Sequence, residues 1–280
     1  MRFFISCSHV LLSACLLVAN TARAGEADAT AVVVRIGGTG SSLGTMQHLV
    51  DAFRKTHPQA DFVIVPSLGS GGGIKALRAG VIDVALISRP LKETERGPDI
   101  MAVEYARTPL VFATAMPATV VALTMPDLVS IYVGERKTWP NGRPLRLVLR
   151  PAAESDTDII KSLSPEMSQA VTAALARPGM IMALTDKASA DSLETIPGAF
   201  GTTTLAQIIS ENRGLQPLVI DGVTPSLTTL VEGKYRYYKT FFTVTGPKTS
   251  PLAQEFTVFV RSATGREILQ SNGHWVAPAK

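Results

Sequence analysis

Short apolar runs alternate with amphipathic segments along the first part of the chain. The runs at residues 31–36, 61–65 and 84–87 predict buried strands. Between them, apolar residues recur at helical spacing in residues 43–55 and 74–79, which predicts two helices. The order strand–helix–strand–helix–strand predicts a parallel sheet with crossover helices.

The same alternation continues to the C-terminus without an internal repeat or a low-complexity linker. Further strands are predicted at residues 101–114, 119–123, 145–149, 219–220 and 237–244. Further helices are predicted at residues 125–132, 159–163, 166–176, 251–261 and 265–270. The pattern therefore predicts an α/β fold, and composition marks no boundary between domains.

The N-terminal residues 1–24 have the organisation of a secretory signal peptide. Arg2 precedes an apolar stretch, and Ala22-Arg23-Ala24 fits the small-x-small cleavage pattern. Cleavage would remove both cysteines, Cys7 and Cys15, so the mature chain would carry neither a disulfide nor a thiolate site. Residues 12–15 also fit a lipoprotein cleavage box with a lipid on Cys15, but the apolar run continues beyond that cysteine, which favours soluble release.

Composition excludes several classes of protein. Hydrophobic residues make up 46% and charged residues 18%, which is too apolar for a disordered chain. The net charge of +4 is spread without a Lys/Arg block, so we expect no nucleic-acid partner. No HExxH, no His/Cys cluster and no EF-hand loop occurs, so we expect neither a metal nor another cofactor.

Three turns rich in Ser, Thr and Gly lead into predicted helices. They are Thr39-Gly40-Ser41-Ser42, Ser70-Gly71-Gly72-Gly73 and Glu154-Ser155-Asp156-Thr157, the last one shortly after Arg150. Helix N-termini attract anions through unpaired N–H groups, and hydroxyls and a guanidinium add donors. Any one such turn is usually only a helix cap, but three of them in an exported α/β chain predict a site for a small anion.

Residues 40–44 also match G-x-S-x-G, the nucleophile elbow of serine hydrolases, with Ser42 as the nucleophile. His48, His57 and His274 could each supply the base. However, the elbow would lie on the very first strand, and no HGGG-type oxyanion segment precedes it. An exported serine hydrolase is therefore the second hypothesis.

Several motifs in order resemble the periplasmic phosphate-binding proteins of bacterial ABC importers, nearly from end to end. They include the glycine–serine turn at residues 70–76, the segment 83–91, and the stretch 127–134 followed by Thr138-Trp139 and Asn141-Gly142, which is the most specific match. Residues 197–201, 223–226, 233–235 and 256–278 resemble later motifs of the family.

The resemblance implies a two-lobe periplasmic solute-binding fold of type II. Each lobe would be a mostly parallel sheet flanked by helices, with the ligand in the cleft between the lobes. We expect residues 25–105 plus 219–280 to form lobe one and residues 106–218 to form lobe two. Ligand binding would close the lobes by a hinge motion.

The resemblance also implies ligand-binding residues, which carry over unevenly. The positions that match the family are Ser41, Ser42, Ser70, Gly71, Ser88, Arg150, Ser155, Asp156 and Thr157. Asp156 stands where close phosphate binders have Gly, which adds a negative charge beside the anion. Ser88 replaces a carboxylate that accepts a proton from phosphate in some relatives, which weakens discrimination against a fully ionised oxyanion.

These features together imply a binding protein and not an enzyme. We expect a periplasmic monomer that captures phosphate or a similar oxyanion and delivers it to an ABC permease in the inner membrane. The alternative within the same fold is a ligand-sensing or envelope-associated protein without transport.

Overall fold

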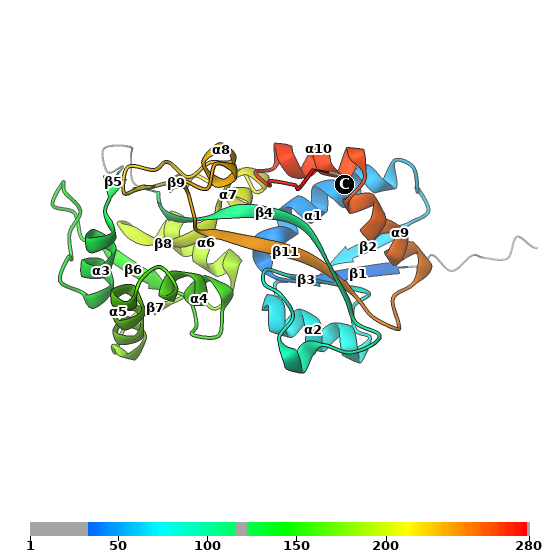
Figure 1. Ribbon diagram of the computed structural model, residues 1–280, viewed down its shortest axis with the longest axis horizontal. Coiled ribbons are helices and arrows are strands. Elements are labelled where there is room, and N and C mark those ends of the chain that lie inside the picture. Colours follow the sequence, from blue (N-terminus) through cyan, green and yellow to red (C-terminus); the bar gives the residue numbers. More distant parts are fainter. Residues whose placement is uncertain (1–32, 116–121, 279–280) are drawn as a thin grey trace, which may run out of the picture. The chain divides into compact units, whose positions relative to one another are not determined.

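A nine-stranded mixed β-sheet runs through the part of the chain that the computed structural model describes, residues 33–115 and 122–278 (Figure 1). Its spatial order is β2-β1-β3-β11-β4-β8-β6-β7, and β9 pairs with β4, while β5 and β10 form a separate two-stranded sheet. The strands are β1 (Val33–Gly38), β2 (Asp61–Ile64), β3 (Val84–Ile87), β4 (Met101–Thr114), β5 (Ala122–Leu123), β6 (Arg146–Leu149), β7 (Ile181–Met182), β8 (Ala199–Thr204), β9 (Gln216–Pro217), β10 (Val219–Ile220) and β11 (Tyr238–Thr245).

Helices connect and cover these strands. The α-helices are α1 (Leu43–Arg54), α2 (Gly69–Ala79), α3 (Met125–Val133), α4 (Ser155–Lys161), α5 (Pro165–Ala176), α6 (Asp186–Thr195), α7 (Leu205–Ser210), α8 (Leu227–Val231), α9 (Pro251–Val260) and α10 (Ala263–Ser271). Two short 3₁₀ helices are η1 (Gly40–Ser42) and η2 (Glu93–Glu95). None of the helices within the described ranges has the length and apolar character that a membrane span requires.

The sheet is parallel at both ends and antiparallel in the middle. β1 pairs in parallel with β2 and β3, as the sequence predicts, and β6 pairs in parallel with β7 and β8. Between these groups lie the long strands β4 and β11, which run antiparallel side by side (Figure 1). The predicted α/β class is confirmed. The pairing of β11 with β3 joins segments far apart in the sequence, and the local pattern does not predict it.

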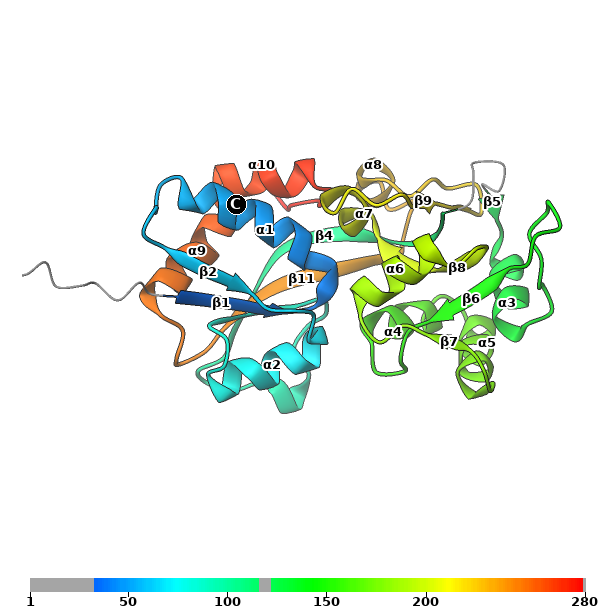
Figure 2. The same cartoon turned by 180° about the vertical axis from the view of Figure 1, so that it is seen from behind.

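The hydrophobic core consists of separate clusters on the two faces of the sheet. On the β1–β3 side, α1, α9 and α10 cover one face, and α2 packs on the other (Figures 1 and 2). On the β6–β8 side, α3 and α5 contribute to one cluster, and α6 and α7 contribute to another. The division into lobes at residues 105/106 and 218/219 stays a prediction, because residues Ala31–Lys280 form one unit.

Two predicted turns are wrong in part because helices begin earlier than the pattern indicates. The glycine-rich segment 67–73 is already helical from Gly69 onward, and the predicted turn 152–157 becomes α4 at Ser155. In α2, a Cβ on Gly73 would lie 2.9 Å from Cα of Gly38, so glycines on both sides allow the helix to lie directly on β1. The pattern also misses α6 and β8 entirely. The predicted signal peptide, residues 1–24, and the lipid site at Cys15 lie outside the described residues.

Candidate anion-binding site

Three serine hydroxyls from different elements meet at the carboxyl end of β3. The Oγ atom of Ser88 lies 2.8 Å from Oγ of Ser155 and 3.3 Å from Oγ of Ser70. Ser70 lies in the first turn of α2, Ser155 begins α4, and the Ser88 N–H donates to Oγ of Ser70 at 3.0 Å. The structure thus brings the predicted second and third turns and Ser88 to one place.

A cavity of about 450 Å³ opens beside this serine group and is lined by the first turn of α2, including Ser70 and Gly71, and by Ser155. Its charged lining consists of four cations and two carboxylates, namely Lys75, Arg78, Arg89, Lys92, Glu95 and Glu154. Cations outnumber carboxylates, and the helix N-terminus adds positive potential, so the cavity favours an anion.

Arg89 is partly neutralised within this cavity. Its guanidinium donates to both carboxylate oxygens of Glu95 at 2.6 and 2.7 Å, and this bond with Arg89 holds the pKa of Glu95 below its usual value. The cations left for a ligand are therefore chiefly Lys75, Arg78 and Lys92.

The first predicted turn does not present its donors to this cavity. The Gly40 N–H and the Thr39 Oγ1 both donate to Oδ2 of Asp186, at 2.9 and 3.2 Å. Oγ of Ser41 lies 3.1 Å from Oγ1 of Thr39, and Ser42 donates its hydroxyl to the Thr39 carbonyl at 3.2 Å. The predicted ligands Ser41 and Ser42 are therefore engaged within their own turn.

Thr157 is likewise occupied locally. Its Oγ1 donates to the carbonyls of Arg150 and Pro151, at 3.1 and 2.9 Å, and so fixes the turn between β6 and α4. Of the nine predicted site residues, Ser70, Gly71 and Ser155 line the cavity, and Ser88 bonds to two of them.

A buried charged cluster lies next to the serine group and contains Arg150 and Asp156. Lys239, which is 1% exposed, forms ion pairs with Asp156 and with Asp186, the latter at 2.9 Å. Nη2 of Arg150 lies 3.8 Å from Asp186 and 3.3 Å from Glu154. Three segments far apart in the sequence, β11, α4 and α6, thus meet through charge pairing.

The opposite charges in this cluster stabilise one another's ionised forms. Burial by itself would raise the pKa of Asp186, but Lys239 and Arg150 hold that pKa below its usual value. Burial by itself would lower the pKa of Lys239, but Asp156 and Asp186 raise it. Burial raises the pKa of Glu154, and the nearby Asp186 carboxylate adds to that rise while Arg150 opposes it.

Arg150 keeps one donor unused. Its Nη1 donates to the Ala183 carbonyl at 2.6 Å and its Nη2 to Glu154, but the buried Nε has no hydrogen-bond partner among the residues that the structure describes. A buried N–H without an acceptor is costly, so a ligand or a water that accepts from Nε would be stabilised.

The described residues give Ser42 no histidine partner. Nε2 of His274 lies 3.0 Å from Oγ1 of Thr45, Nε2 of His48 lies 3.1 Å from the Ser210 carbonyl oxygen, and Nε2 of His57 lies 2.9 Å from Oε1 of Glu255. The geometry therefore offers no catalytic Ser–His pair at this position.

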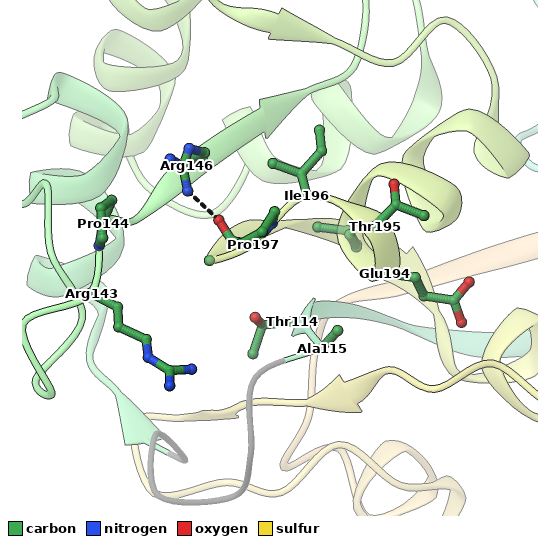
Figure 3. Close-up of a pocket in the computed structure, with 11 residues that line it drawn as sticks. Thr114, Ala115, Arg143, Pro144, Arg146, Glu194, Thr195, Ile196 and Pro197 are labelled. Atoms are coloured by element: carbon green, nitrogen blue, oxygen red, sulfur yellow. Dashed lines mark hydrogen bonds between the residues drawn. The ribbon is translucent and has the colours of Figure 1, made fainter.

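Another cavity, of about 320 Å³, lies where β4 ends and β6 and β8 begin (Figure 3). Arg143, Arg146 and Glu194 line it, and Arg146 donates to the Pro197 carbonyl. None of the predicted ligand residues takes part in its lining. In the described ranges, no group of three or more His, Cys, Asp or Glu side chains could hold a metal ion.

Comparison with protein families shows which superfamily the chain belongs to. A family model described as a PBP superfamily domain matches residues 23–264. The chain belongs to this superfamily. No curated protein sequence matches the chain significantly.

Solved structures with this PBP fold superpose over most of the chain. A substrate-binding protein assigned to phosphate ABC transport, from Clostridium perfringens with phosphate bound, has a TM-score of 0.74 at 20% identity and covers 88% of this chain and 100% of its own. An ABC-type phosphate transport receptor from Vibrio cholerae has a TM-score of 0.61 at 19% identity, with coverage of 88% and 100%. The periplasmic molybdate-binding protein of Azotobacter vinelandii has a TM-score of 0.62 at 14% identity, with coverage of 88% and 100%. The predicted type II periplasmic binding protein fold is confirmed.

Sequence reasoning missed two central residues of this PBP domain, Lys239 and Asp186. The sequence does contain a pattern that could have identified Lys239. Lys239 alternates with the buried Phe241 and Thr243 along β11, and a lysine on the core-facing side of a strand needs a buried partner of opposite charge. Asp186 has no such signal, because Thr185-Asp186 at the start of a helix is an ordinary capping sequence.

Proposed function

We propose that the chain binds a small oxyanion, phosphate or a chemically similar ion, at the cavity between α2 and α4. The observation that carries this proposal is the convergence of Ser70, Ser88 and Ser155 beside a cavity lined by more cations than carboxylates. Hydroxyls and helix N–H groups are neutral donors suited to an anion, and Gly71 lets the anion approach the backbone.

Phosphate and molybdate are both compatible with this site. The neighbours from Clostridium perfringens and Vibrio cholerae are named for phosphate, and the one from Azotobacter vinelandii is named for molybdate. In this chain Ser88 supplies a hydroxyl next to Ser155, at a position where a carboxylate would favour a protonated anion. We therefore propose an oxyanion site of relaxed selectivity.

The further steps of the proposal are closure and delivery. The proposed lobes are residues 25–105 plus 219–280 and residues 106–218. Separate core clusters on the two sides of β4 and β11 support two lobes, although Ile220 packs in the cluster of the second lobe. A periplasmic chain would close on its ligand by bending these two strands, and the closed form would deliver the anion to an ABC permease.

Calorimetric titration of the full chain with phosphate, sulfate, arsenate, molybdate and tungstate tests the proposal. We expect binding heat and an increase in Tm with at least one of them, because a ligand that binds only the folded state stabilises it by mass action. Ser155→Ala removes a hydroxyl at the site and should weaken binding by about 1–3 kcal/mol.

Ser162→Ala is the matched control for this variant. Ser162 directly follows the same helix α4 and is exposed, and its hydroxyl donates to the Ile159 carbonyl, away from the cavity. Equal affinity in both variants would locate the site elsewhere, and no heat with any of the five anions would refute oxyanion binding.

A further inference from the structure

The carboxylate of Asp186 is held in the way that a bound oxyanion would be. Its Oδ2 accepts from the Gly40 N–H at 2.9 Å and from Oγ1 of Thr39 at 3.2 Å, and its Oδ1 accepts from Nζ of Lys239 at 2.9 Å. The residue is 4% exposed. A main-chain N–H, a hydroxyl and a buried cation are the donor types that the first turn was predicted to offer to a ligand.

Asp186 also fills the space at which a small anion would reach this turn. A Cβ on Gly40 would lie 3.1 Å from Cβ of Asp186 and 2.8 Å from Oγ of Ser67, so the backbone at Gly40 is closely covered. Asp186 comes from α6, 146 residues away from Gly40 in the sequence. Two distant parts of the chain are thus joined through one carboxylate.

The charge balance of the cluster opposes a second anion there. Two cations, Arg150 and Lys239, face three carboxylates, Glu154, Asp156 and Asp186. With all five ionised, the cluster has one excess negative charge, and repulsion between like charges is strong where water is excluded. The α2 cavity has the opposite balance.

We propose that Asp186 is a resident anion that occupies the first-turn half of the oxyanion site and thereby determines which anions the protein accepts. The inference rests on the proposed function and deepens it. A ligand then contacts Ser70, Ser88 and Ser155 without the donors of Thr39 and Gly40. An oxyanion that would also need the Thr39 and Gly40 donors binds weakly to the wild-type chain, because Asp186 already accepts from them.

Substitution of Asp186 should therefore increase affinity for inorganic oxyanions. Asp186→Asn and Asp186→Ser both remove the negative charge, and Ser also leaves space for an ion beside Gly40. We expect the Kd for phosphate, measured by calorimetry on the full chain, to fall by about tenfold or more, as is typical when a desolvated like charge is removed from a binding site.

Asp156→Asn is the matched control. Asp156 pairs with the same Lys239, so its loss changes the charge equally, but it bonds to Thr202 and not to the first turn. A fall in Kd with the Asp186 variants that is clearly larger than that with Asp156→Asn supports the inference. Equal gains in all three variants, or none with the Asp186 variants, would overturn it while wild-type binding keeps the proposed function intact.

Anion rescue gives a second readout if the Asp186 variants are unstable. Phosphate added to Asp186→Ser should raise its Tm, or restore its folding, more than the same phosphate does for wild type, because the ion takes the position of the missing carboxylate. A variant whose stability does not respond to phosphate would overturn the inference. Absence of phosphate binding in wild type together with binding by Asp186→Ser would support the inference and refute phosphate as the wild-type ligand, whereas absence in both would refute both proposals.

Discussion

The hydroxyl of Ser88 lies 2.8 Å from the hydroxyl of Ser155, although 67 residues separate them in the sequence. The contact joins the residue after β3 to the first residue of α4. Both side chains are buried, so each hydroxyl depends on its few partners for hydrogen bonds. A substitution of Ser88 should therefore change the affinity of any anion that binds beside Ser155.

Ser88→Asp should change selectivity between anions more than it changes stability. A carboxylate at this position accepts a hydrogen bond from protonated phosphate but repels fully ionised sulfate. We expect the ratio of the sulfate Kd to the phosphate Kd to rise by about tenfold or more, which corresponds to at least about 1.4 kcal/mol. Calorimetry with both ions checks this, with Ser88→Asn as the uncharged variant of similar size. An unchanged ratio in Ser88→Asp would show that the anion does not contact this side chain.

Lys239→Met should destabilise the protein strongly. The substitution preserves much of the volume but leaves Asp156 and Asp186 buried with Arg150 as the nearest cation. Breaking a buried ion pair on one side typically costs about 3–5 kcal/mol of unfolding free energy. Lys187→Met is the control, because Lys187 is 69% exposed and its pair with Asp191 should contribute less than about 1 kcal/mol. Urea unfolding compares the two, and similar losses would mean that the buried cluster is not a structural requirement.

The regular part of the fold follows from local patterns. Strand β3 is predicted with its observed ends because it is an apolar run bounded by turn residues, and β4 is also predicted with its observed ends. Helix α2 begins earlier than predicted, at Gly69, and its Gly73 lies against Gly38, a packing condition that is set by the tertiary structure. In that position glycine favours the helix, although its intrinsic propensity opposes it.

The site is predictable only where the chain places residues at helix starts. Ser70 and Ser155 are found in this way, and both line the cavity. The turn at Gly40 has the same composition, yet its donors are occupied by Asp186, which comes from a helix that the pattern misses. The local sequence indicates which hydrogen-bond donors a turn offers. Which acceptor occupies those donors depends on how distant segments such as α6 pack against the turn.

Two glycines in α2 should respond in opposite ways to alanine. Gly71→Ala places its Cβ no closer than 4.0 Å to the nearest atom, Nη2 of Arg89, so helix propensity should raise stability by about 0.5–1 kcal/mol. The same Cβ projects beside the cavity and should weaken anion binding. Gly73→Ala meets the Gly38 backbone at 2.9 Å and should reduce stability by about 1–3 kcal/mol. Thermal unfolding and phosphate titration measure both effects, and undiminished binding by Gly71→Ala would place the ligand away from the start of α2.

Acid should destabilise the protein through His274. Burial lowers the pKa of His274 from 6.5 to about 3, so the folded state keeps this imidazole neutral while the unfolded chain takes up a proton as the pH falls below about 6.5. Stability from this group is therefore complete above pH 6.5 and should fall by about 1.4 kcal/mol per pH unit below it. His274→Gln keeps an amide that can bond to Thr45 and should lessen this slope, whereas His48→Gln, at an exposed position, should not. Urea unfolding between pH 7 and pH 4.5 checks the difference, and identical slopes in wild type and His274→Gln would assign the acid sensitivity to other groups.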